Sequence, residues 1–232
     1  MSEILKTGNS AFTIDVPFEL LETGAVSKKP LIIYLHGFNQ NIEYFQKKVE
    51  LMLELEAYHL FVQAPYPVYD TKRKRKVSRW GRAWYLYDGE QEQFIRSMEK
   101  ASEFIDKVIK ETTSELKVSR TCLFGYSMGA YLGGYFALSR PDQINELITI
   151  GGRIKTESFE GKRQRADHIN VLALHGSNDS SVYPEPQKEC VEQLVQDGFK
   201  AEFRLINAGH KLEDIFIRES VDWLSSIGYS ES

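Results

Sequence analysis

Short apolar runs alternate along the chain with longer segments in which apolar residues recur at helical spacing. Five runs are rich in branched and aromatic residues and lack strict alternation, which is typical of strands covered on both faces of a parallel sheet. They lie at residues 31–35, 60–62, 121–124, 147–150 and 171–174. Residues 12–16 alternate between apolar and polar side chains and predict an antiparallel edge strand. Residues 201–206 predict a last strand near the opposite edge.

Helical periodicity fills the intervals between these strands. We expect a long amphipathic helix over residues 91–112 and a central, tightly packed helix over 128–138, which is apolar nearly all round. Three further helices are marked by Phe45, Val49, Met52 and Leu53, by Val191, Leu194 and Val195 between Pro186 and Gly198, and by Ile217, Val221, Leu224 and Ile227. Strands alternating with helices predict an α/β fold with a right-handed, doubly wound, mainly parallel sheet and helices on both faces. We see no repeat or linker, so we expect one domain over residues 1–232.

Composition narrows the class of protein. The 232 residues are 42% hydrophobic and 27% charged, and the formal net charge of −4 gives no reason to expect a nucleic-acid or membrane partner. Residues 1–10 lack the apolar region of a secretory signal, and no stretch approaches the roughly 20 apolar residues that cross a bilayer. Cys122 and Cys190 fall in a predicted strand and a predicted helix. Reduced core thiols of a cytoplasmic protein are favoured over a disulfide or a catalytic cysteine.

The sharpest chemical signal is the segment Gly125-Tyr126-Ser127-Met128-Gly129. It lies between a predicted buried strand and the apolar helix, which is the setting of a nucleophile elbow. A serine at such a turn adopts a strained backbone, and the small residues on both sides relieve crowding. The helix start adds backbone N–H groups beside the hydroxyl. This setting favours a nucleophilic Ser127 over a chance match to the pattern.

A serine nucleophile needs a neighbouring base. With this type of elbow the partners follow in the order serine, acid, histidine, which leaves His168, His175 and His210 as candidates. His210 lies in a loop between the last predicted strand and the last predicted helix, where such sheets collect functional groups. We therefore expect His210 to be the base. His175 is expected to shape the turn that carries the acid, and His168 to be solvated.

Asp179 is the expected acid, because it follows the strand at 171–174 through a loop of glycine and polar residues. Its role would be to hold the tautomer of the histidine and to stabilise the imidazolium. The alternative is an aspartate that caps the following helix. Asp167 and Asp214 are competitors, although Asp214 falls in the opening turn of the last helix, where a carboxylate is expected anyway.

The segment His36-Gly37-Phe38 follows the strand at 31–35. The backbone N–H groups of Phe38 and Met128 could together hold a developing oxyanion. With these pieces, the chain resembles the phospholipase/carboxylesterase family of α/β-hydrolases, which includes small carboxylesterases and acyl-protein thioesterases. The matching segments are Leu35-His36-Gly37, Gly125-Tyr126-Ser127-Met128-Gly129, Leu174-His175-Gly176 with Asp179, and Gly209-His210.

The resemblance implies that Ser127, Asp179 and His210 form a triad and that Phe38 and Met128 supply the oxyanion N–H groups. It implies hydrolysis of a small-molecule ester or thioester, as in carboxylesterases and lysophospholipases, with no metal or organic cofactor. Two departures concern the substrate. Met128 stands where acyl-protein thioesterases usually have glutamine, and Val182 is followed by Tyr183 rather than proline.

Only about 20 residues separate the strands at 147–150 and 171–174, so we expect no large lid domain. Trp80, Trp84, Tyr85 and Phe159 fall in predicted loops, where they could line a substrate groove or simply pack. The basic run Lys72 to Lys76 is favoured as a solvated loop, with attraction of an acidic substrate as the alternative.

Two other functions stay open. A peptidase or acyltransferase could use the same triad, and a catalytically idle binding protein could keep the fold. The sequence does not predict the oligomeric state.

Overall fold

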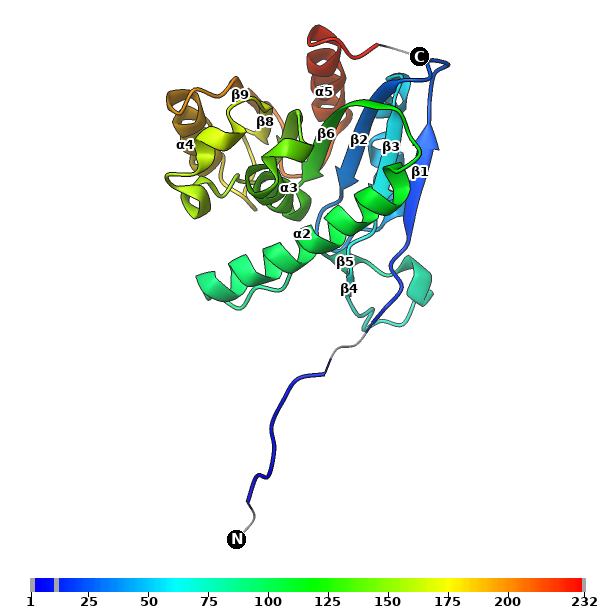
Figure 1. The fold of residues 1–232 in the computed structure, drawn as a ribbon, viewed down its shortest axis with the longest axis vertical. Helices are drawn as coiled ribbons and strands as arrows, with labels where there is room; N and C mark the ends of the chain where they lie inside the picture. Colours follow the sequence, from blue (N-terminus) through cyan, green and yellow to red (C-terminus); the bar gives the residue numbers. More distant parts are fainter. Residues whose placement is uncertain (1–2, 11–12, 231–232) are drawn as a thin grey trace.

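A seven-stranded sheet runs through the computed structural model of the chain, which describes residues 3–10 and 13–230 (Figure 1). The strand order is β1-β3-β2-β6-β7-β8-β9, and every neighbouring pair is parallel except β1 with β3. The strands are β1 (Phe18–Glu22), β2 (Lys29–Leu35), β3 (Tyr58–Val62), β6 (Val118–Tyr126), β7 (Glu146–Ile150), β8 (Asn170–Gly176) and β9 (Ala201–Ile206). A small antiparallel pair is formed by β4 (Tyr66–Pro67) and β5 (Arg82–Ala83). The expected mainly parallel α/β sheet is confirmed.

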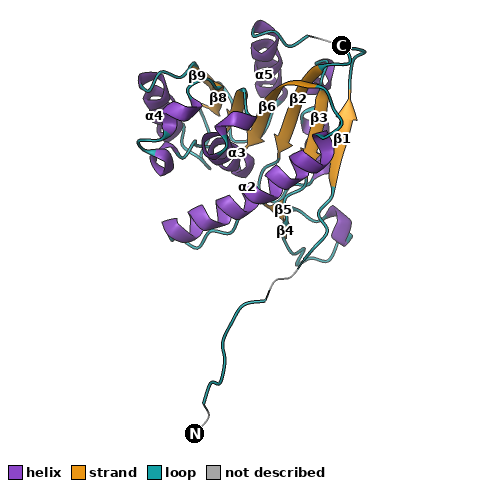
Figure 2. Cartoon of the chain, in the orientation of Figure 1, coloured by secondary structure: helices purple, strands orange, loops and turns teal. Residues whose placement is uncertain are grey.

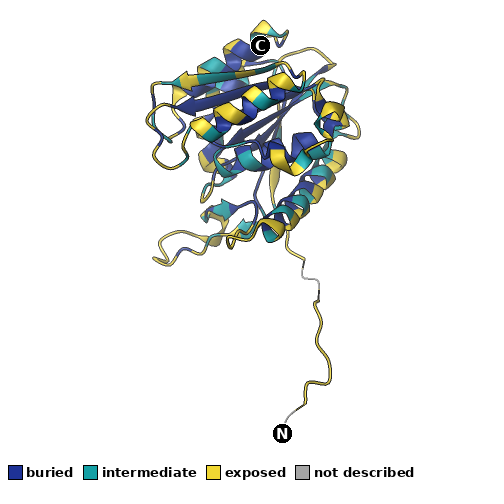
Figure 3. Cartoon of the chain, turned by 90° about the vertical axis from the view of Figure 1, so that its left-hand side faces the viewer, coloured by how far each residue is buried: buried dark blue, intermediate teal, exposed yellow. Residues whose placement is uncertain are grey.

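Helices cover both faces of the sheet (Figure 2). They are α1 (Ile42–Lys48), α2 (Gln91–Thr113), α3 (Met128–Ser139), α4 (Glu185–Gln196) and α5 (Asp214–Ser226). Successive residues of β2 point to opposite faces: Leu31 and Ile33 join the core under α2 and α3, whereas Ile32 joins the core under α1 and α5. The central strands are therefore buried between two helical layers (Figure 3). This is why their sequences read as continuous apolar runs.

The predicted antiparallel edge strand is displaced along the sequence. Residues 13–16 are not in a strand and Phe12 lies outside the described residues, whereas β1 occupies Phe18–Glu22. Pairing with β3 begins where the Pro17 carbonyl accepts a hydrogen bond from the Gln63 N–H at 3.1 Å. Proline has no N–H to donate, so it is suited to the start of an edge strand. The segment that forms β1 does not alternate strictly, because Leu20 and Leu21 are both apolar, so the alternation at residues 12–16 pointed to the wrong segment.

The helix expected around Phe45 to Leu53 is divided into two. The α-helix α1 ends at Lys48, and the 3-10 helix η1 (Glu50–Glu54) follows. The Val49 N–H is shared between the carbonyls of Phe45 and Gln46, at 3.1 and 3.2 Å. Such sharing tightens the last turn of a helix. The chain therefore changes direction before η1 packs its buried Met52 under the sheet.

The connection from β7 to β8 is short, as expected. It holds the 3-10 helices η4 (Thr156–Phe159) and η5 (Arg163–Ala166). The 3-10 helices η2 (Val77–Arg79) and η3 (Pro141–Gln143) lie in other loops. Residues 3–10 extend away from the body of the molecule (Figure 1). Across the described ranges, no helix combines the length and apolar character needed to cross a bilayer.

Candidate active site

Ser127 occupies the turn between β6 and α3, with φ 52° and ψ −116°. Residues other than glycine rarely adopt this backbone conformation, and it persists only where the surroundings enforce it. One restraint is the hydrogen bond from the Ser127 N–H to the Ile150 carbonyl, at 2.8 Å, which ties the turn to the end of β7. The side chain stays half-exposed. The strained turn expected of a nucleophile elbow is thus present.

The two glycines of the motif are required by close packing around this turn. A Cβ atom at Gly125 would lie 2.4 Å from the Gly129 carbonyl oxygen. A Cβ atom at Gly129 would lie 2.1 Å from the carbonyl oxygen of Leu35, at the end of β2. Real Cβ atoms do not approach backbone oxygens so closely, because van der Waals repulsion rises steeply at these distances. The glycines therefore let α3 start directly against the sheet.

The three residues predicted as a triad lie together although they are far apart in sequence. The Ser127 Oγ is 2.9 Å from Nε2 of His210, and Nδ1 of His210 is 2.7 Å from Oδ2 of Asp179. Asp179 follows β8 and His210 follows β9, so both loops leave the same carboxyl edge of the sheet as the Ser127 turn. Because the Asp179 carboxylate can only accept, Nδ1 of His210 carries the proton. Nε2 is then free to accept a hydrogen bond from the serine hydroxyl.

The Asp179 carboxylate is buried and held in place by its own loop. Its Oδ1 accepts hydrogen bonds from the N–H groups of Ser181 and Val182, each at 2.9 Å. Burial by itself raises the pKa of the Asp179 carboxyl, but these hydrogen bonds and the one from His210 outweigh it and lower that pKa below its ordinary value. Asp179 is therefore ionised at neutral pH and oriented toward the imidazole.

His175 lies near the end of β8, just before the loop that carries Asp179, and is fully buried. Its Nε2 donates to the Val182 carbonyl at 2.9 Å. Burial lowers the pKa of His175, so this ring is neutral. The expectation that His175 shapes the turn carrying the acid agrees with this contact, because the bond fixes Val182, whose N–H in turn holds Asp179.

The start of α3 packs against the segment that follows β2. The Trp84 N–H lies 3.5 Å from Sδ of Met128, and the indole Nε1 of Trp84 donates to the His36 carbonyl at 2.7 Å. Met128 is the first residue of α3, so its N–H has no acceptor within the helix. The Phe38 N–H likewise has no acceptor in the described part of the chain. Two unused backbone donors are thus carried by the start of α3, directly after Ser127, and by the loop that follows β2, against which α3 packs.

His36 supports the loop that carries Phe38. The ring is buried, its Nε2 accepts the Ala64 N–H at 3.2 Å, and its Nδ1 donates to the Gly37 carbonyl at 2.8 Å. A second proton on the His36 ring would lie on Nε2, and that new N–H group would point at the Ala64 N–H. Burial lowers the pKa of His36 to about 4, so the neutral ring holds this loop at neutral pH.

The four aromatic residues considered for a substrate groove make packing contacts. Trp84 has no exposed surface and Tyr85 is 9% exposed, and both belong to the main core. A residue without exposed surface cannot line an open groove, so the groove interpretation of Trp84 is wrong. Phe159 packs on Tyr135, with ring centroids 5.2 Å apart. The half-buried Trp80 donates to the Arg75 carbonyl, at 3.1 Å.

The competing residues lie elsewhere. Asp214 opens α5, and Asp167 follows η5 at the surface. His168 is exposed, as expected, and its Nε2 lies 3.1 Å from the Pro141 carbonyl oxygen. Cys122 and Cys190 are both buried, in β6 and α4. Within residues 3–10 and 13–230, no group of three or more His, Cys, Asp or Glu side chains is arranged to hold a metal ion.

Tyr126 is a site residue that the sequence analysis did not single out. Its hydroxyl donates to the His210 carbonyl at 2.8 Å, and its ring lies 5.7 Å from the His210 ring. Burial raises the pKa of Tyr126 to about 12, so the hydroxyl keeps the proton that it donates. Its place directly before Ser127 was visible in the sequence, but its contact with a loop 84 residues later was not.

Comparison with solved structures finds the same fold in several esterases. The esterase PE8 aligns with a TM-score of 0.75 at 18% identity, over 92% of this chain and 100% of that one. The carboxylesterase from Mesorhizobium loti gives 0.70 at 17% identity, over 90% and 94%. The Zea mays acyl-protein thioesterase 2 gives 0.67 at 17% identity, over 90% and 98%.

A search of curated protein sequences found no significant match. The sequence profile of the phospholipase/carboxylesterase family, however, matches residues 18–225. That range covers every strand, and every helix except the last residue of α5, together with the Ser127 turn and the Asp179 and His210 loops. The chain therefore belongs to the phospholipase/carboxylesterase family, with the α/β-hydrolase fold.

Proposed function

We propose that the chain is a serine hydrolase that cleaves carboxylic esters or thioesters through an acyl-enzyme on Ser127. The observation that carries the proposal is the pair of hydrogen bonds from Ser127 Oγ to His210 and from His210 to Asp179, at 2.9 and 2.7 Å. These distances fall within the reach expected of a nucleophile, its base and the group that orients the base. Membership of the family supports the same reaction class.

In the proposed cycle, Nε2 of His210 takes the proton of Ser127 as Oγ attacks the carbonyl carbon. The oxyanion accepts hydrogen bonds from the N–H groups of Phe38 and Met128. The imidazolium, stabilised by the charge of Asp179, then protonates the departing alcohol or thiol. Water attacks the acyl-enzyme with His210 again as base. The side chain of His210 is 24% exposed, which supports access of that water.

The test is hydrolysis of p-nitrophenyl butyrate by the wild-type chain and by Ser127→Ala, together with labelling by a fluorophosphonate probe. We expect turnover and labelling by the wild type, and loss of both in Ser127→Ala with an unchanged circular dichroism spectrum. Undiminished turnover by the variant would rule out the mechanism. A wild-type chain that neither turns over nor labels would favour a catalytically idle binding protein.

A second panel separates the reaction classes that share this triad. It compares matched esters, thioesters and peptide amides at equal concentration, with and without an alcohol acceptor. We expect cleavage of esters or thioesters and transfer to water. Preferential cleavage of amides would indicate a peptidase, and preferential transfer to the alcohol would indicate an acyltransferase.

A further inference from the structure

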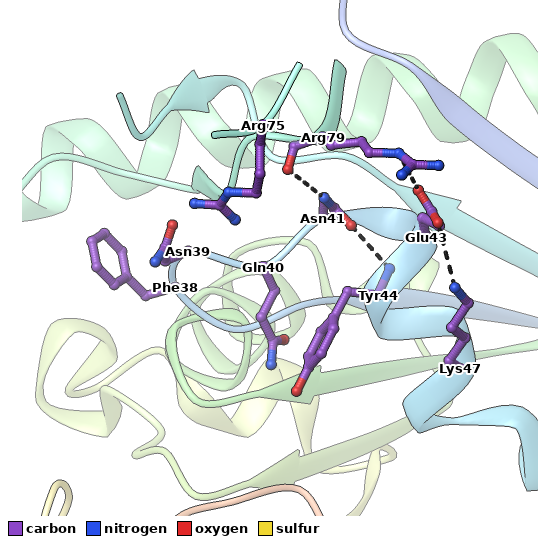
Figure 4. A pocket seen from close by; sticks show the side chains of 9 residues that line it. All are labelled: Phe38, Asn39, Gln40, Asn41, Glu43, Tyr44, Lys47, Arg75 and Arg79. Carbon is purple, nitrogen blue, oxygen red and sulfur yellow. Dashed lines mark hydrogen bonds and ion pairs between the residues drawn. The ribbon is translucent and has the colours of Figure 1, made fainter. Parts of the chain in front are cut away.

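A pocket of about 430 Å³ opens beside the loop that carries Phe38. Phe38 itself lines it, together with residues 39–41 of the same loop and the side chains of Arg75 and Arg79 (Figure 4). Phe38 is 59% exposed, and its backbone N–H is one of the two donors proposed for the oxyanion. The pocket therefore shares Phe38 with the proposed oxyanion site, although Ser127, Asp179 and His210 do not line it.

The basic segment is fixed to this loop by backbone hydrogen bonds. The Asn39 N–H donates to the Arg82 carbonyl at 2.9 Å, and the Arg82 N–H donates to the Gln40 carbonyl at 2.8 Å. The Asn41 side chain also donates to the Arg79 carbonyl, at 3.1 Å. The two arginines therefore come from a segment that is held in register with the loop carrying Phe38.

The fold of the basic loop directs Arg75 toward the pocket. Oδ2 of the buried Asp70 accepts the N–H groups of Lys74 and Arg75, at 3.0 and 2.9 Å, which turns the chain back on itself. Lys72, Arg73, Lys74 and Lys76 are exposed and do not line the pocket, whereas Arg75 does. The basic run thus has two parts, a solvated loop and one residue aimed at the pocket.

The charge around the pocket is strongly one-sided. Residues 70–82 hold seven lysines and arginines and one acid, in a chain whose net charge is −4. The pocket is lined by three cationic side chains and one carboxylate, that of Glu43. Glu43 lies 3.4 Å from both Lys47 and Arg79, as the connected side chains in Figure 4 show. Arg75 in turn lies 3.7 Å from the carboxylate of the buried Asp70, which does not line the pocket. Two carboxylates against three cations still leave one excess positive charge, which attracts anions and raises their local concentration.

We propose that this pocket is an anion subsite, and that the chain acts on esters or thioesters carrying a carboxylate or phosphate group. A guanidinium binds such groups through paired N–H donors, and the side-chain amides of the 39–41 loop add neutral donors. The inference rests on the proposed hydrolase function and names its substrate class. It assigns to Arg75 and Arg79 the binding of the charged end of the substrate.

The test uses two substrate pairs that differ only in one charged group. Mono-p-nitrophenyl glutarate and p-nitrophenyl valerate carry a carboxylate or a methyl group at the end of the acyl chain. The thioesters 3-(acetylthio)propanoate and S-propyl thioacetate differ in the same way, with a carboxylate or a methyl group at the end of the leaving group. We expect the wild type to prefer the anionic member of at least one pair in kcat/KM, and the pair that shows the preference identifies the side of the substrate that enters the pocket.

We expect Arg75→Gln and Arg79→Gln each to lower the anionic-to-neutral ratio of kcat/KM by about tenfold, the worth of one charge-assisted hydrogen bond. Two matched controls remove the same charge elsewhere. Arg96 resembles Arg79, since it is 66% exposed and lies 3.3 Å from Glu92, whereas Arg79 is 65% exposed and lies 3.4 Å from Glu43. Arg73 lies in the basic loop but not in the pocket. Arg96→Gln and Arg73→Gln should change the ratio less than about twofold.

The outcomes separate this inference from the function on which it rests. Hydrolysis of neutral esters with a ratio that neither pocket variant changes would overturn the anion subsite and leave the hydrolase standing. An equal loss in Arg73→Gln would also overturn it, because the total charge of the loop would then suffice. A wild-type chain that hydrolyses none of the four substrates and does not label with fluorophosphonate would overturn both.

Discussion

Nε2 of His175 lies 3.4 Å from Oδ2 of Asp179, the carboxylate oxygen that also accepts the hydrogen bond from His210. Two imidazoles thus adjoin one charge. Burial lowers the pKa of His175 and keeps it neutral, so the two rings do not compete as cations. The Asp179 charge therefore stabilises only the imidazolium that forms on His210 during the proposed reaction.

Asp179→Asn should abolish the function of the acid while preserving the fold. The Ser181 and Val182 N–H groups bind Oδ1, so the amide oxygen of asparagine takes that place and its NH₂ group faces Nδ1 of His210. Nδ1 must then accept, which moves the ring proton to Nε2 and leaves no acceptor for the Ser127 hydroxyl. We expect kcat to fall on the order of 10³- to 10⁴-fold. Ester hydrolysis and thermal unfolding measure the two effects, and an unchanged kcat would remove Asp179 from the mechanism.

The backbone at Ser127 predicts an unusual order of stabilities. At φ 52° and ψ −116° a Cβ atom is strained, and glycine has none. The free energy of unfolding of the Ser127→Gly variant should therefore be about 1 to 3 kcal/mol higher than that of the Ser127→Ala variant. Both variants lack the nucleophile, so activity does not complicate the comparison. Urea unfolding measures the difference, and a less stable glycine variant would show that the turn is not strained.

Acid should destabilise the fold in the window between pH 6.5 and 4. Burial lowers the pKa values of His36 and His59 from 6.5 to about 4, so in this window the unfolded chain binds protons that the folded chain does not. The contribution of these two histidines to the free energy of unfolding is therefore at its full value above pH 6.5 and is lost as the pH falls toward 4. Each histidine should account for a loss of roughly 3 kcal/mol across the window.

Urea midpoints at pH 7 and pH 5 test this window. His59→Gln should reduce the difference between the urea midpoints at pH 7 and pH 5, whatever its effect on the midpoint at pH 7. His168→Gln is the matched control, because His168 is exposed. A pH dependence that is the same in wild type and His59→Gln would contradict the assignment.

The parts of the site that the sequence predicted are those set by local rules. The Ser127 turn, the long α2 helix and the Asp179 and His210 loops follow from strand and helix patterns and from the place of loops at the carboxyl edge of a parallel sheet. For Trp84 the sequence left groove lining and packing open, because a loop position says nothing about burial, and the structure shows packing. Its indole is enclosed by a contact with the His36 carbonyl, 48 residues away. The pocket beside Phe38 was equally hidden, since it depends on the pairing of residues 39–41 with Arg79 and Arg82.

Two glycines of α3 should respond oppositely to the same substitution. In Gly129→Ala the new Cβ atom meets the Leu35 carbonyl oxygen at 2.1 Å, so α3 must move away from β2. In Gly133→Ala the nearest atom is Cδ2 of Leu123 at 3.6 Å, an ordinary contact. Alanine favours a helix over glycine, so Gly133→Ala should be neutral or stabilising by about 1 kcal/mol. Gly129→Ala should destabilise by about 1 to 3 kcal/mol, the usual cost of overpacking, and should also displace the Met128 N–H from the proposed oxyanion.

Activity distinguishes this displacement from a loss of stability alone. At a temperature where both variants are folded, Gly129→Ala should lower kcat for a neutral ester, because the oxyanion would lose a correctly placed donor. Gly133→Ala lies one helical turn further along α3 and should keep the wild-type kcat. Equal kcat values in the two variants would show that the close approach of α3 to β2 serves packing only and does not position the Met128 N–H.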